Sequence, residues 1–149
     1  MIRASLQHEP IDVAGAIADG ASDGAGAIAT FSGIVRADDG VTALELEHYP
    51  GMTEAVMQAL AEQAAARWSL LSVRVVHRVG RMVPGEVVVL VATVAAHRHA
   101  ALEACGFLID MLKSETPFWK REWRGDAGAW VEPRQSDDRA LARWREHPV

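Results

Sequence analysis

The stretch that decides the fold is residues 87–123, VVVLVATVAAHRHAALEACGFLIDMLKSETPFWKREW. Its first part, 87–96, is the most apolar run of the chain and is rich in β-branched residues. This run has only about half of the ~20 residues that a membrane-spanning helix requires. The turn signal Pro84-Gly85 precedes it, and the chain becomes abruptly polar at His97. These features predict a strand that is buried on both faces and ends at a sheet edge.

The segment after this strand has a helical pattern. Its apolar residues recur at i, i+4, i+7 and i+11, as Ala101, Cys105, Leu108 and Leu112. The helix should end at Thr116, because a residue that precedes proline is disfavoured in helical backbone.

Side chains alternate in character along residues 118–123, which predicts an extended strand. Lys120 and Glu122 fall on one side of this strand, and tryptophans fall on the other. A strand, a helix and a second strand in this order are expected to bring four basic side chains together. These are His97, Arg98, Lys113 and Lys120.

The rest of the chain alternates helical and extended patterns. We expect strands at 2–7, 27–36, 41–49, 71–79 and 129–132, helices at 10–19 and 52–68, and a turn at 81–85. The turn Asp38-Asp39-Gly40 should join 27–36 and 41–49 as a hairpin, and 129–132 should pair with 118–123. Ser136 can cap a last helix over 136–149, which we expect to pack loosely. Hairpins around two long helices indicate an α+β fold with a mixed or antiparallel sheet.

Composition limits the class of protein. The chain has 149 residues, half of them apolar and 23% charged, which suits one globular domain over 1–149. A net charge of −5 argues against a nucleic-acid footprint. A cationic cluster in an acidic protein indicates a small anion as its ligand. The N-terminal residues lack the apolar stretch of a secretory signal, so we expect a cytoplasmic protein.

The basic residues have structural as well as functional interpretations. His97-Arg98 is either an anion clamp or a structural ion pair beside a helix start. Lys113, near a helix end, either stabilises the helix dipole or acts in proton transfer. Glu122 is placed to orient Lys120. Arg36 can pair with the acidic turn or contact an anion.

Other candidates favour structural roles. Cys105 falls in the apolar stripe of its helix, where an inert buried thiol is expected. His77, His97, His99 and Asp110 form a weak candidate metal set, because no zinc-binding spacing supports it. The tryptophans suit packing, and any exposed one would indicate a partner surface. These are Trp119, Trp123, Trp130 and Trp144.

Several motifs occur in order along residues 27–135. They are Phe31-Ser32-Gly33-Ile34-Val35-Arg36, Leu46-Glu47-His48-Tyr49, His77-Arg78-Val79-Gly80, Pro84-Gly85-Glu86, Ala96-His97-Arg98, Glu103-Ala104-Cys105, Asp110-Met111-Leu112-Lys113 and Pro117-Phe118-Trp119-Lys120-Arg121-Glu122. As an ordered set they resemble the large, catalytic subunit of molybdopterin synthase.

The resemblance implies an α/β hammerhead fold with an additional antiparallel sheet. It implies conversion of cyclic pyranopterin monophosphate into molybdopterin, without a cofactor or metal of the protein's own. The two sulfurs would come from a small ubiquitin-like carrier whose C-terminal Gly-Gly ends in a thiocarboxylate. The catalytic subunit would form the homodimeric core of a heterotetramer.

The resemblance also assigns roles to residues of this chain. Lys113 and Lys120 would be catalytic. Arg36, His97 and Arg98 would bind the substrate phosphate and the carboxyl group of the carrier, and the last two could act in the site of a neighbouring protomer. Phe31 and Glu122 would support the site.

Two other functions stay open on the residues alone. A non-enzymatic anion-binding module would keep the arginines without requiring the chemistry of Lys113. A metal-dependent hydrolase would use His97, His99 and Asp110 as ligands.

Overall fold

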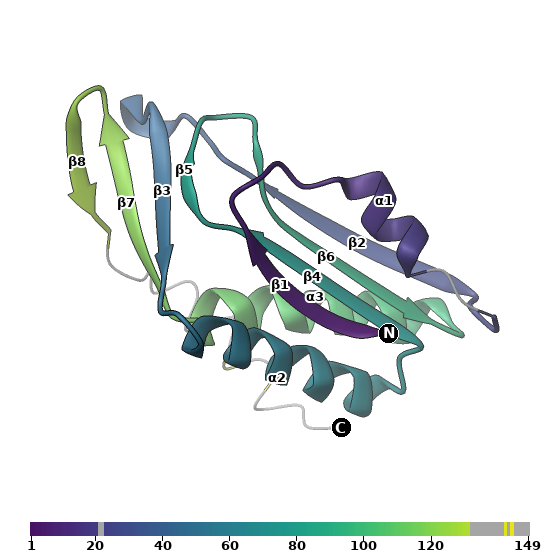
Figure 1. Cartoon of the computed structure of the whole chain (residues 1–149). Coiled ribbons are helices and arrows are strands. Elements are labelled where there is room, and N and C mark those ends of the chain that lie inside the picture. The colour runs from purple at the N-terminus through teal and green to yellow at the C-terminus, as the bar shows by residue number, and fades with distance from the viewer. Residues whose placement is uncertain (21–22, 132–141, 143, 145–149) are drawn as a thin grey trace.

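The computed structural model describes residues 1–20, 23–131, 142 and 144 (Figure 1). In this part of the chain, three α-helices and two four-stranded sheets form the α+β architecture that the sequence predicts. The expected helix over 136–149 falls almost wholly outside the described residues.

The first sheet has the strand order β1-β4-β6-β2. Its strands are β1 (Ile2–Gln7), β4 (Ser72–Arg78), β6 (Val87–Ala95) and β2 (Ala27–Ile34). β1 lies parallel to β4, whereas β6 is antiparallel to both of its neighbours. This is the mixed sheet that the sequence allows.

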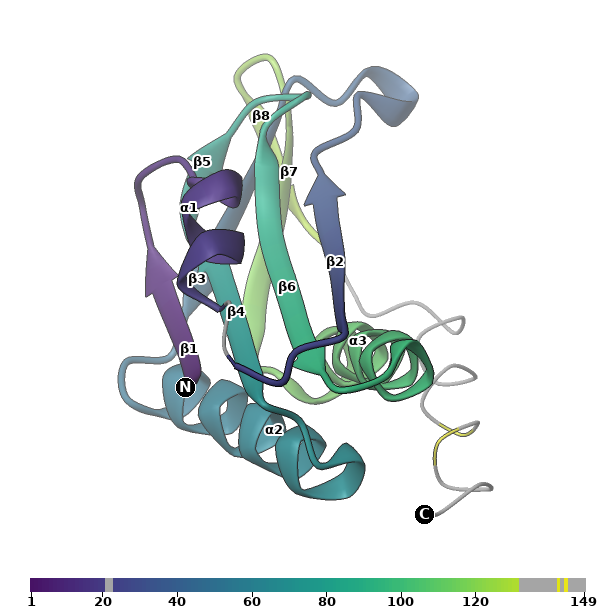
Figure 2. The same ribbon diagram turned by 90° about the vertical axis from the view of Figure 1, so that its right-hand side faces the viewer.

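Helices cover both faces of the first sheet (Figures 1 and 2). α2 (Met52–Trp68) and α3 (Arg98–Glu115) pack on one face, and α1 (Val13–Asp19) packs on the other. In β6, Val91 therefore belongs to the main core and the adjacent Leu90 belongs to the small core under α1. The prediction of a strand buried on both faces is confirmed from Leu90 to Ala95.

The main core consists of apolar side chains from α2, α3 and the first sheet. Phe107, Met57 and Leu108 are among its largest buried members. The fully buried Thr93 of β6 donates a hydrogen bond of 2.7 Å from its hydroxyl to the carbonyl of Ala101, which joins β6 to α3. Removing a side chain as large as Phe107 from such a core costs about 3–5 kcal/mol.

The second sheet is wholly antiparallel and has the order β5-β3-β7-β8. Its strands are β5 (Gly80–Met82), β3 (Ala43–His48), β7 (Phe118–Arg124) and β8 (Ala127–Trp130). The predicted pairing of 118–123 with the strand that follows it is confirmed. That second strand spans Ala127–Trp130, whereas 129–132 was expected. The turn expected over 81–85 is shorter, because residues 80–82 pair with β3 as a strand.

The predicted hairpin of 27–36 with 41–49 is wrong, because β2 and β3 belong to different sheets. Val35 stays with the first sheet, where its N–H donates to the carbonyl of Glu86. A short 3₁₀ turn, Asp38–Gly40, follows, and Asp39 has a left-handed backbone with φ 56°. Hairpin loops usually have about 2–5 residues, and the longer link here carries the chain from one sheet to the next.

Candidate active site

A pocket of about 930 Å³ opens where the two sheets meet the C-terminal end of α3. Arg36, Lys113 and Lys120 line it together with the carboxylates of Asp38, Asp39 and Glu122. Apolar and aromatic side chains also line it, and this part of the lining is called the aromatic floor below: Phe31, Val89, Val91, Ile109, Leu112 and Phe118, with His77 among them. The size suits a small organic ligand.

Lys113 and Lys120 lie on the two elements that flank residues 116–117, where the chain turns from α3 into β7, and both line the pocket. This turn is called the corner below. Lys113 is in the last turn of α3, which ends where Thr116 becomes extended. Lys120 is in β7 opposite Leu46 of β3, and both of these side chains line the pocket. Trp119, the residue before Lys120, points outward and is 49% exposed, so the predicted alternation is confirmed.

Thr53 holds this corner in place and was not singled out from the sequence. Its hydroxyl is fully buried, donates to the carbonyl of Pro117 at 2.8 Å and accepts from the N–H of Tyr49 at 2.9 Å. The start of α2 is therefore tied to the segment between Lys113 and Lys120. A threonine in the first turn of an alanine-rich helix is a weak sequence signal, because such residues usually cap their own helix.

Arg36 takes the first of the two roles that the sequence left open, the pairing with the acidic turn, and its position at the pocket keeps the second a prediction. Its guanidinium lies 3.1 Å from the carboxylate of Asp38, and it also lines the pocket. The two side chains are 68% and 64% exposed, and an ion pair this exposed contributes about 0–1 kcal/mol. An incoming phosphate can therefore compete for Arg36 at little cost.

Lys113 is exposed to solvent, and within the described residues it makes no ion pair. Lys113 and Lys120 are also the lysines of this chain, and both line the same pocket. The three cations of the lining are matched by the carboxylates of Asp38, Asp39 and Glu122, so the pocket is formally neutral in a chain with a net charge of −5. An anionic ligand can bind there through direct contacts with the exposed side chains of Arg36 and Lys113.

Glycine permits a close approach of strands at the pocket wall. β2 has an irregular register at Gly33 and Ile34, and Gly33 lines the pocket. A Cβ atom at Gly33 would lie 2.7 Å from Cγ1 of Val89 on β6. The absence of a side chain therefore lets β2 and β6 pack closely beside the site.

His77 is a pocket residue that the sequence suggested only as a metal ligand. It is partly buried at the end of β4, and its ring lies 4.3 Å from the ring of Phe118. Burial lowers the pKa of His77 to about 4, so the imidazole is neutral at physiological pH. The sequence signal that could have identified His77 as a pocket residue is its position on the same face of β4 as the buried Val73 and Val75.

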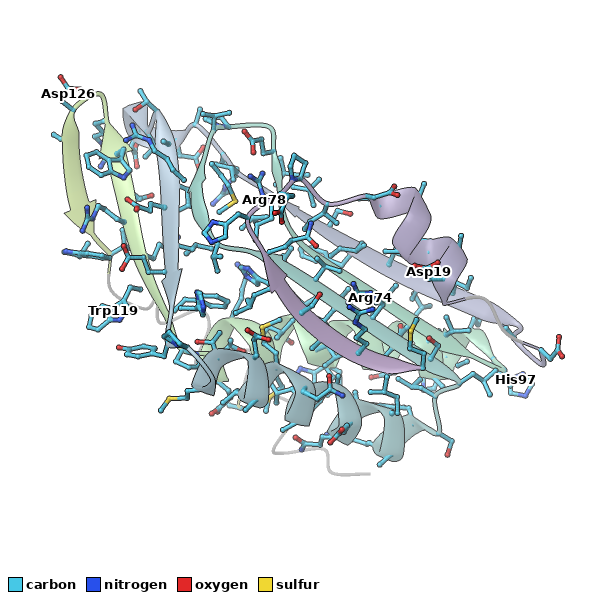
Figure 3. The ribbon with its side chains drawn as sticks, viewed as in Figure 1. Asp19, Arg74, Arg78, His97, Trp119 and Asp126 are labelled. Carbon is cyan, nitrogen blue, oxygen red and sulfur yellow. The ribbon has the colours of Figure 1, made fainter. Side chains whose placement is uncertain are left out.

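His97 and Arg98 do not join the cationic cluster, and this part of the prediction is wrong for a single protomer. Both are exposed and lie at the N-terminal end of α3, whereas Lys113 is in its last turn. Figure 3 shows His97 at the opposite end of the molecule from Trp119. The strand, helix and strand are formed as expected, but the length of the helix separates the two ends.

The remaining candidates have structural surroundings. Burial raises the pKa of the Cys105 thiol to about 11, in agreement with an inert thiol. Among the residues that the structure describes, no three His, Cys, Asp or Glu side chains are grouped to hold a metal ion, so the candidate metal set is not assembled. No helix in the described part of the chain is long and apolar enough to cross a membrane.

The tryptophans divide into packed and exposed residues. Trp144 packs on Trp68 and Phe107, and its indole N–H donates to Asp110 at 2.6 Å. Trp119 and Trp130 are about half exposed on the outer face of the second sheet, where their rings lie 5.9 Å apart. The guanidinium of Arg121 lies 4.0 Å from the ring of Trp130, so it belongs to this outer face.

A pocket with an exposed arginine, two lysines and aromatic lining residues suits the class of proteins that bind small organic anions. Comparison with known proteins narrows this class. The family model described as "MoaE protein" matches residues 6–115. The chain therefore belongs to the MoaE protein family.

Named relatives and solved structures agree with this assignment. A "Molybdopterin synthase catalytic subunit" of Cereibacter sphaeroides is 48% identical over 147 residues, which cover 96% of this chain and all of the relative. A protein of the same name from Caulobacter vibrioides is 50% identical, with 80% of each chain covered. The structure of molybdopterin cofactor biosynthesis protein E from Burkholderia multivorans is 44% identical and superposes with a TM-score of 0.81 over 97% of each chain.

A more distant structure shows the same fold. Molybdopterin synthase from Staphylococcus aureus is 28% identical, has a TM-score of 0.80 and covers 85% of this chain and 95% of its own. The fold expected from the resemblance is thus confirmed, including the additional antiparallel sheet.

Proposed function

We infer that this chain is the catalytic subunit of a molybdopterin synthase. It transfers two sulfurs from a thiocarboxylated carrier protein to cyclic pyranopterin monophosphate and so forms the dithiolene of molybdopterin. The observation that carries this proposal is the convergence of Lys113, Lys120 and Arg36 on one pocket in a chain of the MoaE family. Both the phosphorylated substrate and the thiocarboxylate are anions that these three cations can bind.

Lys113 is the central catalytic residue of the proposal. Its exposed ammonium is available to stabilise the negative charge that develops when the thiocarboxylate sulfur attacks a side-chain carbon of the substrate, or to transfer a proton. Lys120 adds electrostatic support from β7. Glu122, on the same face of β7, and Phe31, on β2, complete the supporting wall.

Anion binding falls to Arg36 and, from a neighbouring protomer, to His97 and Arg98. Within the described residues Arg36 makes one exposed ion pair, with Asp38, which leaves its guanidinium able to bind phosphate or carboxylate bidentately. His97 and Arg98 are exposed at the far end of α3, which suits residues that complete a partner's pocket in a symmetric dimer.

The proposed assembly is a homodimer of this chain, acting as a single domain, with one ubiquitin-like carrier at each pocket. The carrier's Gly-Gly tail enters the pocket and its sulfur bonds to a substrate carbon. Water then cleaves the acyl–sulfur bond, so that the sulfur stays on the substrate and the tail leaves as a carboxylate. No metal or cofactor of the protein's own takes part, and the complex works in the cytoplasm.

The test is product formation from thiocarboxylated carrier and cyclic pyranopterin monophosphate. Wild type should form the dithiolene, and Lys113→Ala should lose 10²-fold or more, the usual scale for a lost proton-transfer group. Arg121→Ala is the matched control, because Arg121 is a cation on the outer face of the same strand as Lys120. Absence of product from wild type that binds carrier would favour an anion-binding module. Full activity of both Lys113→Arg and Lys113→Ala would keep the synthase function and remove Lys113 from the chemistry.

A further inference from the structure

We propose that His77 is a substrate-binding residue, whose Nε2 accepts a hydrogen bond from a ring N–H of the bound pterin on the aromatic floor of the pocket. This inference rests on the proposed function and adds to it the residue that recognises the heterocycle. It concerns the uncharged end of the substrate, whereas Arg36 and the two lysines concern its anionic end.

The tautomer of His77 is set by the backbone. Its Nδ1 lies 2.9 Å from the carbonyl oxygen of Arg78. A carbonyl only accepts, so Nδ1 carries the hydrogen and donates it. The neutral imidazole then has an unprotonated Nε2, which is an acceptor.

Nε2 remains accessible from the pocket. Within the described part of the chain, no donor bonds to Nε2. The side-chain atoms that are both fully buried and unpartnered do not include Nε2, so this nitrogen keeps some exposure. His77 lines the pocket beside Val89, its partner in the register of β4 and β6. His77 therefore borders the space that a ligand would fill, and Nε2 is its ring nitrogen without a hydrogen-bond partner among the described residues.

The surroundings of His77 suit a flat heterocycle. Phe118 lies against its ring at 4.3 Å with an angle of 31° between the planes, and Phe31 and Val91 line the same floor. The charged groups of the pocket are the donors Arg36, Lys113 and Lys120 and the acceptors Asp38, Asp39 and Glu122. A pterin ring presents N–H groups, which need an acceptor once they leave water, and His77 supplies a neutral one among apolar side chains.

The backbone amides of the carrier tail are the competing donors. A glycine tail is narrow and has no flat face to lie on the aromatic floor, so the pterin is the better fit to this geometry. If the pterin is the donor, His77 variants should lose affinity for the substrate. If the carrier tail is the donor, they should lose affinity for the carrier.

The test compares His77→Phe, which keeps an aromatic ring without the acceptor, with His77→Gln, which keeps an acceptor. Calorimetry with cyclic pyranopterin monophosphate and no carrier should show about tenfold weaker binding to His77→Phe, with recovery in His77→Gln. KM for the substrate should rise by a similar factor with little change in kcat, and the affinity for the carrier should be unchanged. His48→Phe, on β3 outside this pocket, is the matched control.

Nitrogen NMR of wild type tests the contact without a variant. Adding cyclic pyranopterin monophosphate should shift the Nε2 resonance of His77, even if His77→Phe fails to fold. An unshifted resonance, or unchanged substrate affinity in a folded His77→Phe, would overturn the inference. Weakened binding of the carrier alone would overturn it in favour of the tail. These outcomes are separate from the proposed function, which fails only if wild type makes no product.

Discussion

Arg98 and Lys113 lie at opposite ends of α3, in the first and last turns of one 18-residue helix. At 1.5 Å per residue, their backbones are about 22 Å apart along the helix axis. A single phosphate or carboxylate cannot contact both side chains within one protomer. If both serve the same reaction, they serve it across a subunit interface.

Complementation between inactive chains tests this arrangement. Lys113→Ala and Arg98→Ala chains, mixed in equal amounts and allowed to exchange subunits, should recover about a quarter of wild-type activity. The reason is that half of the dimers are then mixed, and each of these has one intact pocket out of two. The measurement is dithiolene formation before and after mixing.

A mixture of Lys113→Ala with Lys120→Ala is the control for this experiment. Both lysines line the pocket of the same protomer, so every pocket of the mixed dimer lacks one of them and activity should not recover. Equal recovery in both mixtures, or none in either, would contradict the assignment of Arg98 to the partner's pocket.

The low pKa of His77 predicts that stability falls in mild acid. Burial lowers this pKa from its ordinary value of 6.5 to about 4, so between these values the unfolded chain binds the proton more strongly than the folded chain. Stability should therefore be constant above pH 6.5 and decline as the pH falls towards 4, by about 3 kcal/mol in all for this group. Urea unfolding at a series of pH values measures it.

His77→Phe should have a shallower decline over the same pH range, because it lacks the titrating group. His48→Phe serves again as the comparison for loss of a histidine elsewhere. If His77→Phe and wild type lose stability in parallel between pH 6.5 and 4, the imidazole is not held neutral by the fold.

Cys105 should take no part in sulfur transfer. With a pKa of about 11, only about one thiol in ten thousand is ionised at pH 7. Native protein should therefore react slowly with iodoacetamide, and Cys105→Ala should keep its rate of dithiolene formation. Mass spectrometry follows the alkylation, and the denatured protein provides the reactive control. If Cys105→Ala folds normally but forms no product, the prediction is wrong and Cys105 takes part in sulfur transfer.

Gly33→Ala should reduce stability and disturb the pocket wall. The new Cβ would lie 2.7 Å from Cγ1 of Val89, which must move, and crowding of this kind costs about 1–3 kcal/mol. Thermal unfolding measures the loss, and Ser32→Ala on the same strand should change stability less. A variant as stable as wild type would mean that β2 and β6 separate without cost.

The local pattern of the sequence predicted most of the secondary structure. The bounds of α2 and β1 agree with expectation, and α3 ends one residue before Thr116, because helical periodicity and the proline signal act over a few neighbouring residues. The ordered motifs by themselves also indicated the family. Lys113 and Lys120 were expected to share a site, and they do.

Tertiary structure decided which strands pair and which charges meet. The sequence favoured a hairpin of β2 with β3, since neighbouring strands often pair. In the structure β2 pairs along its length with the buried strand β6 instead. The sequence also placed His97 and Arg98 beside Lys113, and the rigid length of α3 separates them. His77 and Phe118 lie far apart in sequence, and only the meeting of the two sheets brings their rings together. Periodicity thus determined the elements, and long-range packing determined the site.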